Sequence, residues 1–553
     1  MSKIYAKIVD SMQKVFPTEE PTGEEYGKTI LQNERANFQL AYKNDTGNTF
    51  ALAKIDVEGD LAPFVTIRSA ELVPAAYFPQ FNDTYTISQQ PGLFPDPLKP
   101  LGALGVVLPA WQWKAFFVSV EDTEGFKAGV YTLKFILHTR EGEELSRLNY
   151  RLEVLPVSAA ETDLKITNWM HYDGIEAKHG VKLFDNDFYT VFAGYLREYV
   201  RAGNNMLLTP LFTPPLDTEI GGERRTAQLV GVKLTKNGGY TFNFEPLKKF
   251  GGFAFSHGIK YLEFSHLFTQ WGGKCCPKIM AETENGEQKK IFGWETASDS
   301  KEYLAFLDAF LTKLVAFINE QGWQGKCYFH LTDEPWTEHL ERYTFLRDFV
   351  KARIGELPVM DAISHYEFYE KGGVDVPVPI TGSFKAFENK GIKELFVYYC
   401  CGPYQGFYSN RFLNMPLQRT KIIGAQLYET GVHGFLHWGF NFYNTAKSYA
   451  EVNPYEDTSA GMMFPAGDSF VVYPGANDAV GSLRSETLGE GFFEYRVLKT
   501  LESYIGKKKA LKILHDFGVK GYEEYPRSSA EHRAMREKIY SALKKAAKSK
   551  ETR

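Results

Sequence analysis

The feature that most constrains this fold is an alternation of strand-like and helix-like segments from about residue 164 to residue 443. Such alternation predicts parallel β/α units, and eight apolar runs favour a (β/α)8 barrel of the TIM type over an open sheet. No glycine fingerprint or P-loop follows the first run, which disfavours a nucleotide-binding doubly wound fold. The runs are KITNWMHYDG, NNMLLTP, KYLEFSHLF, CYFHLTDEP, PVMDAIS, VDVPVPITG, KELFVYYCCGP and HGFLHWGFNFY.

The N-terminal region reads as strand and turn only, which predicts a β-sandwich. Its segments are NFQLAYKN, TFALAKIDV, FVTIRSAELVPA, AFFVSVEDT, GVYTLKFILHT and LNYRLEVLPV, the last two resembling a hairpin at the sandwich edge. Beyond about residue 450 the pattern becomes mainly helical. We therefore expect an α/β protein with an added all-β domain. Its parts are a sandwich over 1–158, a catalytic barrel over 159–450, and a strand plus helices packing on the barrel over 451–553.

The net charge and the cysteine content limit which binding partners and which cellular compartment we expect. The net charge is −5 and no basic stripe occurs, so nucleic acid is an unexpected partner. Neither a signal peptide nor a run of about 18 apolar residues is visible, so we expect no membrane association and a cytoplasmic location. The five cysteines are an odd number with two vicinal pairs and no export signal, which predicts free thiols. Their spacing matches no metal site, so we expect neither a metal nor another cofactor. The oligomeric state is left open.

The strongest candidate for chemistry is the stretch HLTDEPW, which ends the fourth run of the predicted barrel. Active-site residues of such barrels lie at the C-terminal ends of the strands. Asp333 and Glu334 would point to opposite faces of a regular strand, but Pro335 favours a break that lets both carboxylates enter one cavity. The alternative is a solvated acidic turn, or an N-cap of the next helix.

Other strand ends carry aromatic, histidine, amide and carboxylate side chains, and no lysine or arginine stands among them to suggest a phosphate clamp. This mixture predicts a site for a neutral sugar, although an amide or peptide would also fit. Trp169 and Trp438 could instead be core residues, and Glu263 could be a charge paired inside the barrel. Tyr398 and Tyr399 cannot both face the interior of a regular strand. The predicted substrate contacts are Trp169, His171, Tyr172, Glu263, His266, Trp336, Tyr398, Tyr399, His437, Trp438, Asn441 and Tyr443.

Four segments together carry a resemblance to a known family: LTDEP, FVYYCCGP, HGFLHWGFNFY, and DSFVVYPG with the later GSLRSETLGEGFFEYRVLKTLE. Over about residues 160–505 the chain resembles glycoside hydrolase family 123, long catalogued as domain of unknown function 4091. The resemblance implies an exo-acting β-N-acetylgalactosaminidase. It also implies substrate-assisted catalysis by the adjacent pair, which falls on Asp333 and Glu334.

In substrate assistance the 2-acetamido oxygen of the sugar attacks the anomeric carbon, so one acid and one neighbouring anion suffice. The resemblance implies that Glu334 protonates the leaving oxygen and later activates water, while Asp333 stabilises the oxazolinium charge. Two close carboxyls separate in pKa, which would help Glu334 to stay protonated. Trp438 and Trp169 are candidates for the wall around the acetamido methyl, and Tyr398 or Tyr399 for the donor to its carbonyl. In a cytoplasmic enzyme the substrate should be a small imported oligosaccharide or glycoside.

Two alternatives remain at this stage. In the first, the chain is a retaining glycosidase of sugars without an acetamido group. Glu334 is then the acid/base, and a carboxylate such as Glu263 or Asp361 is the nucleophile. In the second, the chain is a non-catalytic glycan-binding protein on a barrel scaffold. The excursion at residues 269–299 could be a lid, a binding wall or a subunit contact.

Overall fold

The computed structural model describes residues 4–79, 83–403 and 408–551. Contacts between residues divide the chain into two compact units. The first unit joins residues 1–163 with 404–431 and 480–553, and the second joins residues 164–403 with 432–479. The predicted boundaries near residues 158 and 450 follow sequence pattern rather than contacts, and they stay predictions.

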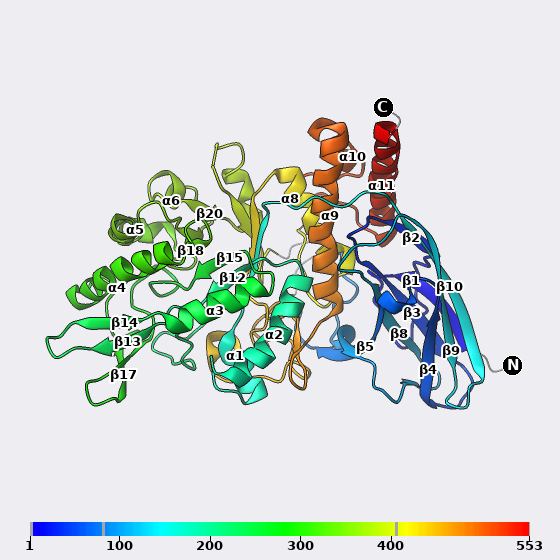
Figure 1. The fold of residues 1–553 in the computed structure, drawn as a ribbon, viewed down its shortest axis with the longest axis horizontal. Helices are drawn as coiled ribbons and strands as arrows, with labels where there is room; N and C mark the ends of the chain where they lie inside the picture. Colours follow the sequence, from blue (N-terminus) through cyan, green and yellow to red (C-terminus); the bar gives the residue numbers. More distant parts are fainter. Residues whose placement is uncertain (1–3, 80–82, 404–407, 552–553) are drawn as a thin grey trace. The chain divides into compact units, whose positions relative to one another are not determined.

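The first unit contains two five-stranded sheets that share one hydrophobic core (Figure 1). Phe38 from one sheet stacks on Tyr150 from the other with ring centroids 3.9 Å apart, as expected of a sandwich. In spatial order, the first sheet is β1 (Ile4–Asp10), β3 (Ala36–Asn44), β8 (Trp113–Val120), β5 (Val65–Ala75) and β6 (Gly92–Pro100). The second is β2 (Gly27–Ile30), β10 (Glu144–Val154), β9 (Gly129–His138), β4 (Phe50–Glu58) and β7 (Val106–Leu108).

All six strands predicted in this region are present, as β3, β4, β5, β8, β9 and β10. The prediction that the β9–β10 hairpin lies at the sheet edge is wrong, because β4 and β2 flank it on its two sides. Strand β2 pairs in parallel with β10 and is only four residues long. A segment this short shows no alternation that the sequence could reveal.

The helices of the first unit are α7 (Leu417–Lys421), α8 (Ile423–Thr430), α9 (Leu483–Ile505), α10 (Lys507–Asp516) and α11 (Ser529–Glu551). Of these, α8, α9, α10 and α11 share one apolar cluster with the segment that leaves the sandwich. A Cβ atom on Gly424 of α8 would lie 1.7 Å from the carbonyl oxygen of Gly491 in α9. The two helices can therefore approach this closely only with glycine at the crossing. No helix of the described residues has the length and hydropathy needed to cross a bilayer.

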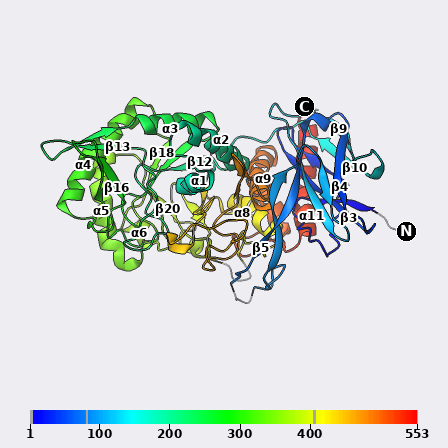
Figure 2. The same ribbon diagram turned by 90° about the horizontal axis from the view of Figure 1, so that it is seen from below.

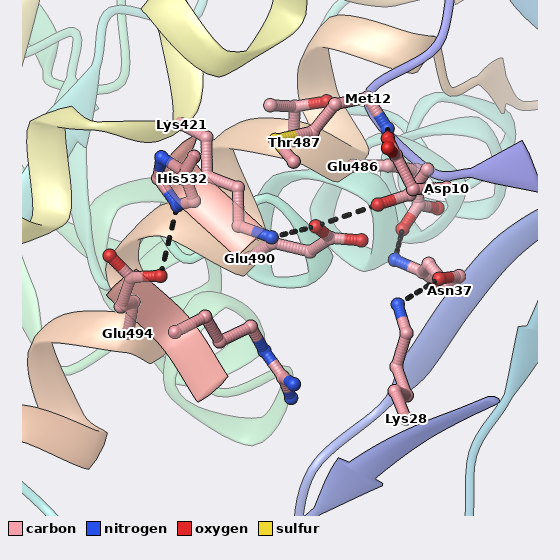
Figure 3. Close-up of polar contacts among 12 residues, drawn as sticks. Asp10, Met12, Lys28, Asn37, Lys421, Glu486, Thr487, Glu490, Glu494 and His532 are labelled. Carbon is pink, nitrogen blue, oxygen red and sulfur yellow. Dashed lines mark hydrogen bonds and ion pairs between the residues drawn. The ribbon is translucent and has the colours of Figure 1, made fainter. Parts of the chain in front are cut away.

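A buried polar cluster connects several elements of the first unit (Figure 3). Glu486, Glu490 and Glu494 lie four residues apart and so share one face of α9. Glu490 accepts from Lys421 Nζ at 2.6 Å, and Glu494 accepts from His532 Nε2 at 3.1 Å. Burial by itself would raise the pKa of Glu490, but the charges of Lys421 and other cations lower that pKa to about 2. The cluster therefore holds α7 against α9 by a paired charge and α11 against α9 by a hydrogen bond.

The second unit contains all eight predicted strands, and every pairing between neighbours is parallel. Three hydrogen-bonded groups form: β12–β15–β18, β19–β20 and β21–β22–β11. Parallel bridges Phe329–Val359 and Ile380–Tyr398 connect the groups in that order. The strands are β11 (Lys165–Asn168), β12 (Met206–Thr209), β15 (Tyr261–Phe264), β18 (Cys327–Phe329), β19 (Met360–Ala362), β20 (Val376–Val378), β21 (Phe396–Tyr398) and β22 (Gly434–His437).

Helices follow most of these strands, and Figure 2 shows several of them around the outside of the strands. They are α1 (Tyr172–His179), α2 (Asn186–Arg201), α3 (Glu245–Ser256), α4 (Lys301–Glu320), α5 (Leu340–Ile354) and the short α6 (Glu367–Glu370). Two hairpins, β13 (Gly231–Leu234) with β14 (Tyr240–Asn243) and β16 (Ile279–Glu282) with β17 (Gln288–Phe292), form one further sheet. The excursion at 269–299 contributes the second hairpin. The protein is thus mixed α/β, with a β-rich N-terminal region and a helical C-terminus.

Candidate active site

Asp333 and Glu334 lie just beyond the C-terminal end of β18. Glu334 has a left-handed backbone with φ +45°, so the strand geometry does break before Pro335. The backbone N–H of Trp271 donates to the carbonyl of Asp333 at 2.8 Å and holds the turn. A non-glycine residue in this conformation is strained, and such strain concentrates at functional sites. The turn therefore removes the constraint that would send the two carboxylates to opposite faces.

The two carboxylates differ in environment. Glu334 is exposed, whereas Asp333 is partly covered. Burial and the nearby charge of Glu334 raise the pKa of Asp333 well above its ordinary value. In the unliganded protein the surroundings therefore disfavour the charged form of Asp333.

Tyr398, at the end of β21, contacts the pair directly. Its hydroxyl donates to Glu334 Oε1 at 2.5 Å. Burial, followed by the charge of Glu334, raises the pKa of Tyr398 well above its ordinary value, so the hydroxyl stays protonated. The next residue, Tyr399, points elsewhere and packs edge-on against Phe435 and His437. Of the two predicted tyrosines, the structure brings only Tyr398 to the pair.

A fully buried polar network lies next to the pair. His330 contacts Glu263 Oε1 with Nε2 at 2.6 Å and Asp361 Oδ1 with Nδ1 at 3.2 Å. Trp169 Nε1 also donates to Glu263, and the Tyr343 hydroxyl donates to Asp361. Burial alone would lower the pKa of His330, but the two carboxylates raise it to about 9. His330 is therefore an imidazolium that donates to a carboxylate on each side.

His266 stacks on His330 with ring centroids 4.3 Å apart. Burial lowers its pKa well below the usual value, and neither ring nitrogen has a hydrogen-bond partner among the described residues. Donor atoms of His266, His330 and Asp361 lie within 4.8 Å of one another, as a metal site would require. As an imidazolium, however, His330 has no lone pair to offer a metal. This set therefore supplies at most two of the three ligands without first breaking the network.

On another side of the site, Trp438 is partly exposed. Its Nε1 donates to Asp468 Oδ2 at 3.0 Å, and its ring contacts Phe442 and Phe464 edge-on. His437 Nε2 lies 3.3 Å from Asp468 Oδ1. Asp468 therefore fixes the plane of the indole.

His171 is buried and neutral. Burial, then the charge of Arg224, lowers its pKa to about 4. Its Nε2 contacts the carbonyl of Trp438 at 2.8 Å, and Nδ1 accepts from Arg224 at 3.3 Å. Asn441 bonds both the N–H and the carbonyl of His171, and Arg224 forms a bidentate pair with Asp173. Asn441 thus orders the backbone beside the site.

The remaining predicted contacts are not brought to the pair in the same way. Tyr172 is buried among phenylalanines and donates to the carbonyl of Leu208 at 2.5 Å. Tyr443 is buried and donates to the carbonyl of Val472 at 3.0 Å. Trp336 is 62% exposed and packs near His365.

A family model for the catalytic domain of glycoside hydrolase 123 matches residues 169–501, more than half of the chain. The chain belongs to glycoside hydrolase family 123. A solved family 123 glycoside hydrolase from Clostridium perfringens, reported for glycolipid glycan hydrolysis, has the same fold. It aligns over 98% of this chain and 97% of its own, with a TM-score of 0.73 at 15% identity.

Two other solved structures are far less similar to this family 123 hydrolase. A β-glucuronidase from Parabacteroides merdae aligns over 89% of this chain and 52% of its own, with a TM-score of 0.32 at 10% identity. A family 20 exo-β-N-acetylglucosaminidase from Vibrio harveyi aligns over 92% of this chain and 99% of its own, with a TM-score of 0.28 at 10% identity. No curated protein matches the chain.

The hydrolase also has site residues that the sequence analysis did not identify. Arg224 and Asp217 lie in the long loop after β12, where no strand pattern marks them. Trp271 lies in the excursion whose role was left open. Asp468 is the first residue of DSFVVYPG, a segment that carried the family resemblance, and this was the one available signal for it.

Proposed function

We propose that this family 123 hydrolase is an exo-acting β-N-acetylgalactosaminidase that retains the anomeric configuration through the 2-acetamido group of its substrate. The observation that carries the proposal is the broken turn after β18, which leaves Asp333 and Glu334 adjacent, with the charge of Glu334 acting on Asp333. Two neighbouring carboxyls suit one sugar that supplies its own nucleophile.

In the first step the acetamido oxygen forms a bond to the anomeric carbon while the bond to the leaving oxygen breaks. Glu334 gives its proton to that oxygen, and Asp333 accepts the acetamido N–H and stabilises the oxazolinium charge. In the second step Glu334 takes a proton from water, and the water oxygen attacks the anomeric carbon. The bond between that carbon and the acetamido oxygen breaks, which reopens the oxazolinium ring. Retention follows because each step inverts the configuration once.

The raised pKa of Asp333 in the free protein adds a requirement to this mechanism. An N–H bond donated to Asp333 by the bound acetamido group favours the ionised carboxylate and lowers its pKa again. Asp333 is then the anion that the first step requires beside Glu334. Substrate binding would therefore prepare the pair for catalysis.

The surrounding residues can be given roles in the same proposal. Tyr398 orients Glu334 through the 2.5 Å hydrogen bond. Trp438 is the better candidate for the wall against the acetamido methyl, because it is partly exposed while Trp169 is buried and bound to Glu263.

The two-carboxylate alternative is disfavoured by the environment of its nucleophiles. Glu263 and Asp361 are both fully buried, and each accepts hydrogen bonds from His330 and from a second donor. A carboxylate saturated in this way cannot reach an anomeric carbon without breaking the network. A purely glycan-binding role is disfavoured by the strained and charge-coupled pair, which a binding surface does not need.

A closed (β/α)8 barrel is part of the proposal. Its support is the pairing of the strand groups through Phe329–Val359 and Ile380–Tyr398, together with the Asn205 N–H bond to the Ile166 carbonyl beside β11 and β12. A cytoplasmic site of action on small glycosides is also proposed. The five cysteines form no disulfide among the described residues, which supports a reducing compartment.

The test is inhibition by an analogue of the cyclic intermediate. A thiazoline that mimics the cyclic intermediate of N-acetylgalactosamine should bind far more tightly than the product sugar, because intermediate analogues bind more tightly than ground states. Equal affinity for the thiazoline and for the product sugar would contradict substrate assistance.

A further inference from the structure

Several strained backbones meet beside the catalytic pair. Left-handed, non-glycine conformations of this kind are strained and persist only where the surroundings enforce them. Two consecutive ones occur in the loop after β22, which is unusual for residues with a Cβ atom. The five residues are Asp217 (φ +40°), Trp271 (φ +59°), Glu334 (φ +45°), Lys447 (φ +58°) and Ser448 (φ +58°).

Hydrogen bonds connect these loops into one structure around Asp217. The N–H of Asp217 donates to Gln270 Oε1 at 2.6 Å, and the next residue, Trp271, donates its N–H to the Asp333 carbonyl. From the other side, Lys447 N–H donates to Asp217 Oδ2 at 3.0 Å. Two neighbouring loops therefore fix Asp217 through its backbone N–H and its Oδ2, and one of those loops also bonds the catalytic turn.

Only one of the two oxygens of the Asp217 carboxylate accepts a hydrogen bond in these contacts. Oδ2 accepts from Lys447, whereas no group of the described residues donates to Oδ1. Burial raises the pKa of Asp217 to about 6, although the Lys447 N–H and the charge of Arg224 act in the opposite direction. The charge of Asp217 in turn raises the pKa of Asp333. A third carboxylate here works against ionisation of Asp333.

An anchor for the loop would not need this charge, because an asparagine could accept the same backbone N–H. A carboxylate oxygen without a donor, held rigidly beside a sugar site, is suited to accept a hydroxyl group. We propose that Asp217 binds a hydroxyl of the same sugar unit that meets Asp333 and Glu334, and so discriminates among sugars by the position of that hydroxyl. This inference rests on the proposed glycosidase function and identifies how the sugar is recognised.

The test measures whether the effect of replacing Asp217 depends on individual hydroxyl groups of the substrate. The parent substrate is the nitrophenyl glycoside that the wild type hydrolyses fastest, compared with analogues that lack the hydroxyl at C3, C4 or C6. Asp217→Asn should lower kcat/KM on the parent by about 10- to 100-fold, the usual value of a hydrogen bond to a charged group. Removal of one particular hydroxyl should cost the wild type a similar factor, but Asp217→Asn less than about threefold, because the partner is already gone.

Glu219→Gln is the matched control. Glu219 lies on the same loop, pairs with Lys447 Nζ at 3.0 Å and accepts from the Tyr449 hydroxyl. It should change neither kcat/KM nor the hydroxyl preference. If Asp217→Asn loses its fold in a thermal melt, Asp217→Glu replaces it, and a displaced carboxylate should alter which hydroxyl matters.

Wild-type kinetics in Asp217→Asn, or equal additive losses with every deoxy analogue, would overturn the assignment. The proposed function fails separately. If the wild type hydrolyses only sugars without an acetamido group, substrate assistance is wrong, but the same cycle on that sugar still decides the role of Asp217.

Discussion

The hydrogen bond between Tyr398 and Glu334 offers a sharp test of the catalytic turn. Replacing Tyr398 by Phe keeps the ring and removes only the hydroxyl, which lies 2.5 Å from Glu334 Oε1. In the proposed mechanism Glu334 becomes an anion as it protonates the leaving oxygen. The Tyr398 hydroxyl should therefore stabilise the product of proton transfer more than the reactant.

The magnitude follows from the exposure of Glu334. A hydrogen bond to a charged group contributes about 1.5–3 kcal/mol, and the lower end applies where water can replace the lost donor. Glu334 is exposed, so about 1.5 kcal/mol is expected, which is roughly a tenfold change in rate. The loss should appear in full only when the leaving group needs protonation.

The assay compares kcat/KM on an alkyl glycoside and on a nitrophenyl glycoside of the same sugar. Tyr398→Phe should lose about tenfold on the alkyl glycoside and less than about threefold on the nitrophenyl glycoside. Tyr399→Phe is the control, because its ring packs on Phe435 and His437 rather than on the pair. Equal losses in the two variants, or equal losses on the two substrates, would refute the assigned role.

Three further predictions concern the pair and the network beside it. Asp333→Asn should lower kcat/KM on an acetamido glycoside by about 10² or more, if anion stabilisation contributes ~3 kcal/mol, and near wild-type rates would defeat that role. Glu334→Gln should affect alkyl glycosides far more than nitrophenyl glycosides, and equal losses would count against it as the acid. His330→Gln should lower the free energy of unfolding by roughly 3 kcal/mol, because Glu263 and Asp361 lose a buried partner. Since folding raises the pKa of His330 from 6.5 to about 9, its contribution is complete below pH 6.5 and is lost as the pH rises through 9. Urea unfolding of the wild type and of His330→Gln at pH 6 and at pH 10 measures this contribution. If the difference in unfolding free energy between the two proteins were the same at both pH values, the prediction would be contradicted.

Much of the fold was predictable because strand periodicity is a local property. All eight strands of the second unit occur in the predicted order. Strand β6 was missed because its segment GLFPDPLKP is rich in proline, which a central strand does not tolerate. It is an edge strand, where the absent N–H groups cost nothing in pairing.

The features of the candidate site were likewise predictable where local backbone rules determine them. The break at Pro335 and the opposite directions of Tyr398 and Tyr399 follow from local backbone rules, and the structure agrees with both. The two-residue alternation of side chains along a strand does not distinguish a side chain that contacts substrate from one that packs inside the barrel. Trp169 and Glu263 were therefore candidates both for substrate contact and for the interior, and in the structure they bond each other in the interior. Asp217 reaches the site from an irregular loop, which no periodicity describes.

The measurement that tests the central claim most directly is hydrolysis of a panel of nitrophenyl glycosides by the wild type. The panel holds β-N-acetylgalactosaminide, β-N-acetylglucosaminide, β-galactoside and β-glucoside. The proposed mechanism predicts turnover of acetamido sugars only, fastest for the N-acetylgalactosaminide. Turnover of plain galactoside or glucoside at a comparable rate would contradict substrate assistance, because those sugars carry no acetamido oxygen to act as the nucleophile.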